Sequence, residues 1–353
     1  MQLTVRRLVI SAAALSALTL ASPRALAQID GLPRLSQRAG TTQVVGIAEV
    51  EVIYHRPGVK GRVVWGDLVP YGHVWRAGAN ENTVLVLSHP ATVEGTLVAA
   101  GRYGLHMIPG EQTWTVMLSK DSNAWGSFSY DVGLDAARAE VKPEKAAFKE
   151  WMQYEFTPHS DDALTLALRW DELRVPIHIE FDTHGLALVK LREAVTGKRA
   201  DKWQTFHNAA NYCLDAGIYT EEALGWIDHA IEGKPLFANL AIRAGLLEGL
   251  ERFDEAQETL DRALRVGNAN EVGAYGSQLK ERGEFDRAVQ FLEVALEKAP
   301  TLWWAWANLG EAFAGLGLEE PAVESYDKAL EFASSADDKA FVRSLRDKLE
   351  RKS

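Results

Sequence analysis

Residues 303–333 read WWAWANLGEAFAGLGLEEPAVESYDKALEFA and contain two helical patterns of small and large apolar residues. In the first pattern, Trp306 and Gly310 stand four residues apart, which places them on one face of a helix. In the second pattern, Ala322 is followed four residues later by Tyr326. Small residues at such positions let two helices approach closely, and the large residues fill the gaps between them. The stretch therefore predicts a pair of closely packed helices.

The same spacing recurs towards the N-terminus. Four alanines are separated by 33, 32 and 34 residues. Each is followed four residues later by an apolar residue, and three residues after that by another alanine. The twelve positions are Ala223, Ile227, Ala230, Ala256, Leu260, Ala263, Ala288, Leu292, Ala295, Ala322, Tyr326 and Ala329. A fixed period of this length is typical of stacked helical repeats.

These repeats resemble the tetratricopeptide repeat, whose signature is W-x2-L-G-x2-Y followed by A-x3-F over 34 residues. The resemblance is strongest in the last two units. It implies about four repeats over residues 200–333 and a polar capping helix over 336–351, all within a helical repeat domain spanning 186–353. An irregular helical bundle remains the alternative. A repeat array offers a concave surface to a protein or peptide partner, and Trp303 and Trp304 are its candidate exposed contact residues.

The chain changes character near residue 185. Residues 41–185 are rich in β-branched and aromatic residues that alternate with polar ones, and clusters of Gly, Pro, Asn and Asp separate the segments. Many short strands at this spacing predict an antiparallel β-sandwich or barrel. Strands are expected at Thr83–Leu87, Arg102–Ile108, Trp114–Leu118, Met152–Phe156, Ala163–Trp170 and Arg174–Phe181. A helical interruption is expected around Val132–Ala139 or Pro143–Lys149, and residues 28–40 are interpreted as a linker.

The densest motifs of the β-rich region lie between Tyr54 and Thr83. They include Trp65-Gly66-x-Leu68-Val69-Pro70-Tyr71-Gly72 and Val74-Trp75-Arg76-x-Gly78-Ala79-Asn80-Glu81. Together with Ile108-Pro109-Gly110 and Trp125-Gly126-x-Phe128-x-Tyr130, they resemble the domain-of-unknown-function 2911 family over residues 37–181. The resemblance implies a β-rich extracytoplasmic domain that often accompanies tetratricopeptide-like helices, and it implies no reaction.

Basic and aromatic side chains gather in this motif block. Arginine suits carboxylate or phosphate, and flat aromatic faces suit a sugar ring or an aromatic ligand. The pattern predicts a pocket for a small polar or anionic ligand. Its candidate residues are Arg56, Lys60, Arg62, Tyr71, His73, Arg76, Asn80, Glu81, Trp125 and Tyr130. The alternative is that Arg76 pairs internally with Glu81 and that the tryptophans form a core.

The first 27 residues read as a secretory signal peptide. Arg6 and Arg7 precede an uncharged apolar run over residues 8–21, and Ala25-Leu26-Ala27 is a cleavage site that predicts a mature start at Gln28. A membrane anchor is the alternative, although the run is short for about 30 Å of hydrocarbon. We therefore expect a periplasmic or secreted protein with no membrane span after cleavage.

The remaining sequence narrows the function classes. A net charge of −11 argues against nucleic acid as a partner. The nine His form no His-Glu-x-x-His motif, no nucleophile elbow or phosphate loop is present, and one cysteine, Cys213, excludes a multi-cysteine metal site. We therefore expect no metal and no cofactor. The favoured hypothesis is an exported binding or scaffold protein. The alternatives are a purely structural protein and a hydrolase or lyase that acts on cell-envelope material or carbohydrate through Arg76, Glu81 and His73.

Overall fold

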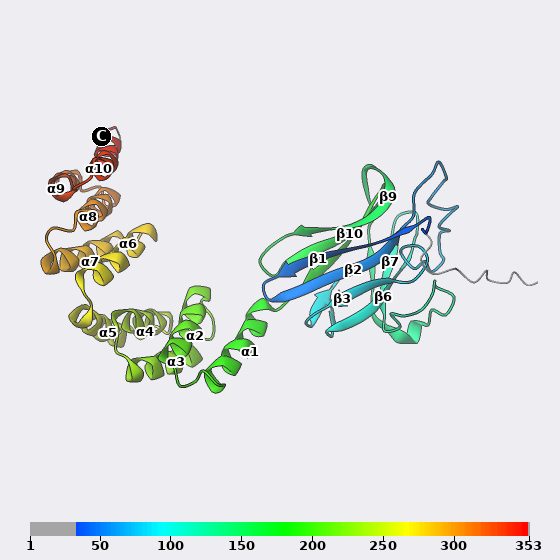
Figure 1. The fold of residues 1–353 in the computed structure, drawn as a ribbon, viewed down its shortest axis with the longest axis horizontal. Helices are drawn as coiled ribbons and strands as arrows, with labels where there is room; N and C mark the ends of the chain where they lie inside the picture. Colours follow the sequence, from blue (N-terminus) through cyan, green and yellow to red (C-terminus); the bar gives the residue numbers. More distant parts are fainter. Residues whose placement is uncertain (1–32, 352–353) are drawn as a thin grey trace, which may run out of the picture. The chain divides into compact units, whose positions relative to one another are not determined.

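A computed structural model describes residues 33–351, and the predicted signal peptide lies outside the described residues. The chain divides after Phe181 into a β domain and a helical array, each with its own internal contacts (Figure 1). Among the described residues, no helix combines the length and the apolar composition that a membrane crossing requires.

The β domain consists of two antiparallel sheets, which confirms the predicted fold class. One sheet has the strand order β1-β2-β3-β6-β7-β8, and the other has the order β5-β4-β10-β9. The strands are β1 (Gln37–Val45), β2 (Ala48–Arg56), β3 (Thr83–Leu87), β4 (Ala91–Val93), β5 (Thr96–Val98), β6 (Gly101–Ile108), β7 (Trp114–Ser119), β8 (Asp135–Val141), β9 (Glu144–Pro158) and β10 (Ala163–Glu180).

Alternation along each strand separates a core face from an outer face. On β2, Val50 and Val52 are fully buried and Tyr54 nearly so. Tyr54 links the two sheets, because its ring lies 4.8 Å from that of Tyr154 on β9 and its hydroxyl accepts a hydrogen bond from the Tyr154 backbone N–H. The core therefore lies between the two sheets.

Three expectations for this domain need correction. Residues 37–40 are not linker but the start of β1, because their backbone pairs with β2 from Gln37 opposite Arg56 onwards. The two strands expected over 163–181 are one strand, since Asp171 takes a positive φ of 53° and shifts the register without ending the ladder. The expected helical interruption shrinks to a single 3-10 turn at Val132–Leu134, and the rest of both candidate ranges lies mostly in β8 and β9.

The helical array begins earlier than residue 186. Helix α1 (Thr183–Thr196) starts directly after the β domain, because the Asp182 side chain accepts a hydrogen bond from Gly185 N and so caps the first turn. The helices that follow are α2 (Trp203–Ala216), α3 (Thr220–Gly233), α4 (Phe237–Gly249), α5 (Phe253–Val266), α6 (Ala269–Glu281), α7 (Phe285–Lys298), α8 (Trp303–Gly315), α9 (Glu319–Phe332) and α10 (Ala336–Glu350).

Helices α2 to α9 form four successive pairs, and α10 packs on the last pair (Figure 1). All twelve positions of the predicted repeat are buried, and none is more than 4% exposed. The first helices of the pairs also contact one another in the order α2, α4, α6, α8. This arrangement leaves a continuous face of first helices, on which a groove can form.

Candidate functional site

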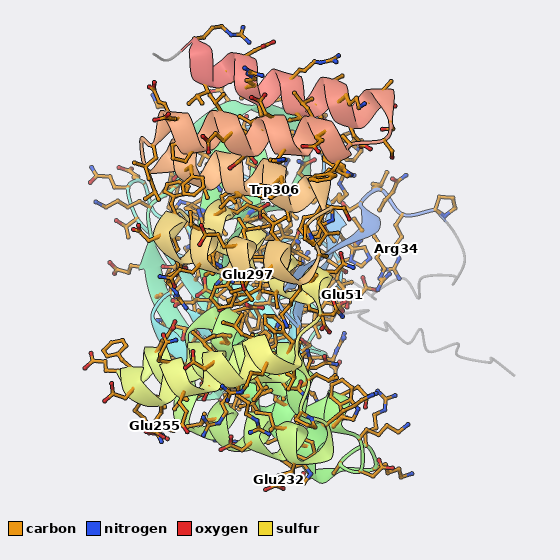
Figure 2. All side chains as sticks on the ribbon, turned by 90° about the vertical axis from the view of Figure 1, so that its left-hand side faces the viewer. Arg34, Glu51, Glu232, Glu255, Glu297 and Trp306 are labelled. Carbon is orange, nitrogen blue, oxygen red and sulfur yellow. The ribbon has the colours of Figure 1, made fainter. Side chains whose placement is uncertain are left out.

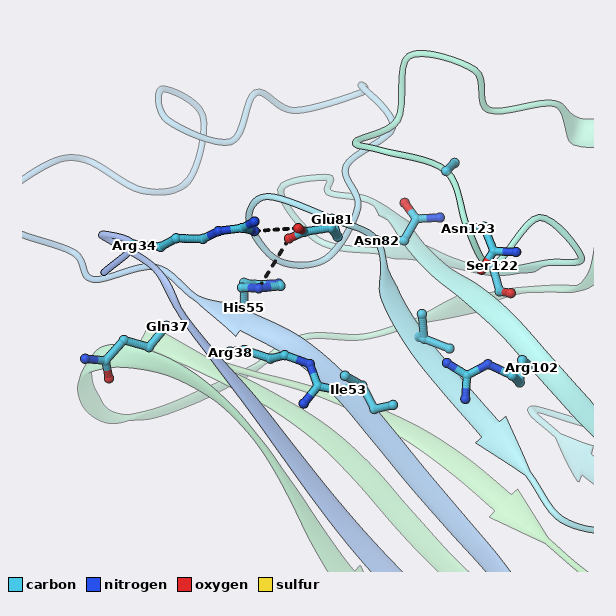
Figure 3. Close-up of a pocket in the computed structure, with 12 residues that line it drawn as sticks. Arg34, Gln37, Arg38, Ile53, His55, Glu81, Asn82, Arg102, Ser122 and Asn123 are labelled. Carbon is cyan, nitrogen blue, oxygen red and sulfur yellow. Dashed lines mark hydrogen bonds and ion pairs between the residues drawn. The ribbon is translucent and has the colours of Figure 1, made fainter. Parts of the chain in front are cut away.

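A pocket of about 620 Å³ lies on the outer face of the six-stranded sheet (Figure 3). The strands β1, β2, β3 and β6 form its floor, and the loop at residues 122–124 contributes one wall. Its lining is polar and mainly basic around a small apolar patch. The lining residues are Arg34, Gln37, Arg38, Ile53, His55, Glu81, Asn82, Val84, Arg102, Ser122, Asn123 and Ala124.

Glycines on β1 and β6 lie on either side of the apolar part of the pocket floor. One row of paired residues crosses β1, β2, β3 and β6 in the order Gly40, Ile53, Val84 and Gly104. A glycine therefore lies at each end of this row. A Cβ on Gly104 would lie 2.6 Å from the backbone oxygen of Asp121, so only glycine lets this loop approach the sheet. Arg38 and His55 pair on one side of this row, and Arg102 pairs with Val86 on the other side.

Glu81 is held at one end of the pocket by two basic groups (Figure 3). The Arg34 guanidinium donates a hydrogen bond to its carboxylate, and the His55 Nε2 atom lies 3.3 Å from Oε2. Burial acts to raise the pKa of Glu81, but the hydrogen bond from Arg34, a backbone hydrogen bond and the nearby charges of His55 and Arg34 outweigh it and lower that pKa from its ordinary value. Glu81 is therefore an anion at neutral pH.

Positive charge exceeds negative charge around the pocket. Arg34, Arg38 and Arg102 face a single carboxylate, that of Glu81, among the lining residues. Arg38 and Arg102 are exposed, and neither has an ion pair within residues 33–351. In a chain with a net charge of −11, this is a local site of attraction for an anion.

Of the residues predicted from the motif block, only Glu81 lines the pocket. Arg56 donates instead to the backbone oxygen of Met152, and Arg62 donates to the oxygens of Gly58 and Val59 in its own loop. The ammonium of Lys60 lies over the ring of Trp151, 5.6 Å from its centroid. These three cations fix backbone and loop geometry and do not converge on a ligand.

The aromatic and turn residues of the block are also spread out. His73 is exposed, and its Nδ1 atom lies 2.9 Å from the backbone oxygen of its neighbour Tyr71. Asn80 adopts a left-handed conformation and donates to Ser36 O, which ties the segment before β1 to this bend. Tyr130 donates to Asp135 at 2.7 Å, and burial together with this hydrogen bond raises the pKa of Tyr130 to about 12.

Arg76 does not line the pocket, and it also does not form the internal pair with Glu81 that was the alternative, since the ion-pair partners of Glu81 among the described residues are Arg34 and His55. Its guanidinium lies over the ring of Trp125, 5.7 Å from the centroid, and burial lowers its pKa. The charge of Glu81 opposes that shift, so the two groups are near each other without direct contact. Trp125 is 60% exposed and stacks on Phe128, which makes this a surface cluster beside the pocket.

The sequence interpretation missed Arg34, Arg38, His55, Asn82, Arg102 and the loop at residues 122–124. Arg34 and Arg38 lay in the presumed linker. The alternation along β2 could have predicted the place of His55, because it puts His55 on the same outer face of the sheet as Ile53. His55 is only 7% exposed although it is polar, because the Arg34 segment and the Glu81 bend cover it.

The β domain is expected to lose stability as the pH falls below 6.5. His55 and His106 are both buried, and burial lowers the pKa of each below 6.5. A lowered folded-state pKa contributes stability that is present above the unfolded-state pKa and lost as the pH falls through the folded one, by about 1.4 kcal/mol per unit of depression. Thermal melts at pH 7.5 and 5.0 measure the loss. The double variant His55→Gln and His106→Gln should lose less stability than the parent protein between these two pH values. Equal losses in the two proteins would show that these histidines do not cause the pH dependence.

A second cavity, of about 590 Å³, lies on the face of first helices in the array. Its floor is apolar and its rim carries amides and charges. The residues that line it are His207, Asn211, Leu214 and Asp215 of α2, Phe237, Ala238, Ala241, Ile242, Gly245 and Glu248 of α4, Glu271, Ala274, Tyr275, Gln278, Leu279 and Arg282 around α6, and Glu284 and Arg287. Ala238 and Ala274 are exposed, and their short side chains leave this groove open.

Trp303 and Trp304 are not exposed contact residues. Both are half-buried, and the ring of Trp304 packs so closely on Gly273 that a Cβ there would lie 2.7 Å from it. Trp303 packs on the core formed by α8, α9 and α10. It is Trp306 that lines a further cavity of about 1000 Å³, together with Glu297 of α7 (Figure 2).

Within residues 33–351 no group of three or more His, Cys, Asp or Glu is placed to hold a metal ion. Cys213 is fully buried in α2, and burial raises the pKa of its thiol. The thiol is thus protonated and enclosed, which suits a small core residue.

The fold and its sites define a two-domain protein in which a β-sandwich with an outer-face pocket precedes a helical repeat scaffold. Residues 36–179 match the family described as protein of unknown function (DUF2911), and residues 305–335 match the tetratricopeptide repeat. Both resemblances drawn from the sequence are thereby confirmed. Arrays of this repeat are scaffolds that bind proteins and peptides.

Comparison with known proteins adds relatives of the repeats. The TPR repeat-containing protein MJ1428 of Methanocaldococcus jannaschii is 33% identical over 144 residues, which are 39% of this chain and 24% of that protein. The chain thus spans about a quarter of the length of this curated relative. Among solved structures, the thermophilic TPR protein TTC0263 of Thermus thermophilus is 22% identical with a TM-score of 0.31, covering 46% of this chain and 90% of its own. MamA from Desulfovibrio magneticus RS-1 is 21% identical with a TM-score of 0.27, covering 43% and 94%.

Proposed function

We propose that the protein is an exported binding scaffold whose helical array holds an extended segment of a partner protein. The observation that carries this proposal is the groove lined by α2, α4 and α6. It follows the first helices of three successive repeats, so a bound segment contacts several repeats at once. The β domain supplies the second binding element of the proposal, a pocket for a small polar ligand around Glu81.

The chemistry of the groove suits an extended segment that has apolar side chains and backbone N–H and C=O groups that are not already hydrogen-bonded within the segment. Leu214, Phe237 and Ile242 give it an apolar floor for anchoring side chains. Asn211 Nδ2 already donates to Asp215 at 2.9 Å and its Oδ1 can accept from a peptide backbone, whereas the Gln278 amide can both donate and accept. The floor therefore provides affinity, and the amides fix the direction of the chain.

Charges at one edge of the groove are already partly neutralised. Arg287 donates to Glu248 at 2.8 Å and to Glu284 at 2.6 Å. Arg282 is exposed and has no ion pair within the described part of the array. We therefore expect the bound segment to place an acidic residue or a terminal carboxylate near Arg282.

Filling the groove should abolish peptide binding without unfolding the array. Ala238→Trp and Ala274→Trp each place an indole in the groove from an exposed position, so little stability is lost. Peptides selected against the parent protein should bind each variant at least about tenfold more weakly, which corresponds to about 1.4 kcal/mol. Fluorescence anisotropy measures the affinity, and Ala340→Trp on α10, exposed and outside the groove, is the matched control. Equal affinity for all four proteins would show that the groove is not the binding site.

Export is a separate part of the proposal, which rests on the sequence of residues 1–27 alone. We expect the protein to be recovered outside the cytoplasm with Gln28 as its first residue. Replacing Ala25 and Ala27 with Arg should block processing, because the cleavage site requires small residues. N-terminal sequencing and cell fractionation measure both results, and an uncleaved Met1 in a membrane fraction would overturn this part.

The alternative of a hydrolase or lyase lacks a supporting geometry. His73 is exposed and contacts its neighbour Tyr71, Arg76 lies over Trp125, and Glu81 is paired with Arg34 and His55. A general acid and base must reach the same substrate atoms. These three side chains have different partners, so binding accounts for the arrangement better than catalysis.

A further inference from the structure

The β-domain pocket has two ends of opposite hydrogen-bonding character. Glu81 and Asn82 lie together at one end, whereas Arg38 and Arg102 lie away from them on the two sides of Ile53 (Figure 3). The first end holds the oxygens of Glu81 and Asn82, with Arg34 and His55 already placed on Glu81, and the second presents two guanidinium groups that have no ion pair within residues 33–351. A ligand that satisfies both ends must carry hydrogen-bond donors and an anionic group.

The acceptor end contains two buried oxygens that form no hydrogen bond within the described residues, and one of them, Glu81 Oε2, lies 3.3 Å from His55 Nε2. Asn82 is only 5% exposed; its Nδ2 donates to Asp121 O at 3.2 Å, and its Oδ1 has no hydrogen-bond partner among the described residues. Oε2 of Glu81 is also buried and, despite the nearby His55 ring, forms no hydrogen bond within the described chain. Buried acceptors are almost always hydrogen-bonded in proteins, so these two oxygens point to a ligand with hydroxyl groups.

The cationic end suits a carboxylate. Arg38 on β1 and Arg102 on β6 are exposed and free of ion pairs within residues 33–351, so neither must give up a partner to bind an anion. The guanidinium group matches the planar fork of a carboxylate through two parallel hydrogen bonds. Ile53 and Val84 lie between the strands of these two arginines and offer an apolar surface to a carbon skeleton.

We propose that this pocket binds a small hydroxylated carboxylate of the sugar-acid kind. The carboxylate binds Arg38 and Arg102, the hydroxyls donate to Asn82 Oδ1 and Glu81 Oε2, and the ring rests on Ile53 and Val84. This inference rests on the small-ligand pocket of the proposed function and specifies its ligand. The pocket volume of about 620 Å³ lies within the range of small-molecule sites.

The negative charge of Glu81 argues for this class over a bare inorganic anion. A phosphate ion carries more charge than a carboxylate, so Glu81 repels it more strongly within the same pocket. Glu81 favours a ligand that presents hydroxyl donors to it and keeps its own charge at the opposite end. Glu81 thereby selects against anions that have no hydroxylated side.

Isothermal titration of the purified protein with three matched probes tests the inference. D-glucuronate carries both features, D-glucose lacks the carboxylate, and cyclohexanecarboxylate lacks the hydroxyls. We expect D-glucuronate to bind at least about tenfold more tightly than either of the others. Arg38→Gln and Arg102→Gln should each weaken its binding about tenfold, whereas Arg138→Gln on β8, outside the pocket, should not.

Each other outcome overturns the inference at an identifiable step. Equal binding of D-glucose excludes the carboxylate contact and leaves a ligand pocket in place. Equal binding of cyclohexanecarboxylate excludes the hydroxyl contacts. Tighter binding of inorganic phosphate replaces the sugar acid with a simple anion. If no probe binds, both the inference and the small-ligand part of the proposed function fail, while the peptide groove is tested separately. Melting temperatures of the arginine variants, both at exposed positions, exclude misfolding as the cause.

Discussion

Trp170→Ala is expected to lower the free energy of unfolding of the β domain by about 3–5 kcal/mol. Trp170 is 1% exposed on β10, and its ring lies 5.6 Å from that of Trp65 and 6.0 Å from that of Trp75. The ring of Trp65 also lies 4.8 Å from that of Trp114 on β7. The four indoles therefore join strands of both sheets, and removing one leaves a large cavity that the others cannot fill.

Scanning calorimetry measures this effect, because the two domains have separate cores. We expect the β-domain transition to move to lower temperature and the array transition to stay unchanged. Trp125→Ala is the matched control, since Trp125 is 60% exposed and its removal should cost about 1 kcal/mol or less. If Trp170→Ala costs no more than Trp125→Ala, the indole cluster is not the core of the domain.

This cluster explains the density of the motif block better than a ligand site does. Trp65 and Trp75 come from the block, and they pack against Trp114 and Trp170. The indole N–H of Trp75 donates to Gly78 O at 3.0 Å, which fixes the bend before Glu81. The motif thus shapes the loops of the domain, and through them it positions Glu81 at the pocket.

The sequence predicted the elements that depend on local periodicity. The strand Thr83–Leu87 and the buried repeat positions, such as Ala288 and Leu292, follow from alternation and from helical spacing. The pocket could not be predicted in this way, because it depends on register between strands. Arg38 and His55 are 17 residues apart and become direct neighbours only because β1 pairs with β2.

Two further differences between the predicted and the observed structure also arise from contacts between residues far apart in the sequence. β10 continues through Asp171 because a bulge shifts its pairing with β9 without breaking it, and no local signal reports a partner strand. Trp303 and Trp304 were expected to be exposed at a helix start, yet the neighbouring helices cover both of them. Side chains near an element boundary are placed by their tertiary neighbours, which a single sequence does not specify.

The array offers a test of its helix packing in which two glycine-to-alanine changes have opposite signs. Gly310 lies in α8 where it meets α9, and a Cβ there would lie 2.6 Å from the Tyr326 ring and 3.1 Å from Ala322 O. Tyr326 is only 2% exposed, so its ring can yield to the added methyl group only by moving against its packed neighbours or towards the cavity that it lines. We expect Gly310→Ala to lower the free energy of unfolding by about 1–3 kcal/mol through overpacking.

Gly225 in α3 provides the opposite case. It is exposed, and nothing lies within 4 Å of the Cβ that an alanine would add. Gly225→Ala should raise the free energy of unfolding by about 0.5–1 kcal/mol, because alanine has the higher helix propensity and restricts the unfolded chain. Urea denaturation followed by the helical circular dichroism signal measures both variants. The same sign for both would mean that Gly310 does not lie at the crossing of α8 and α9, and the close approach of first and second helices would then need another explanation.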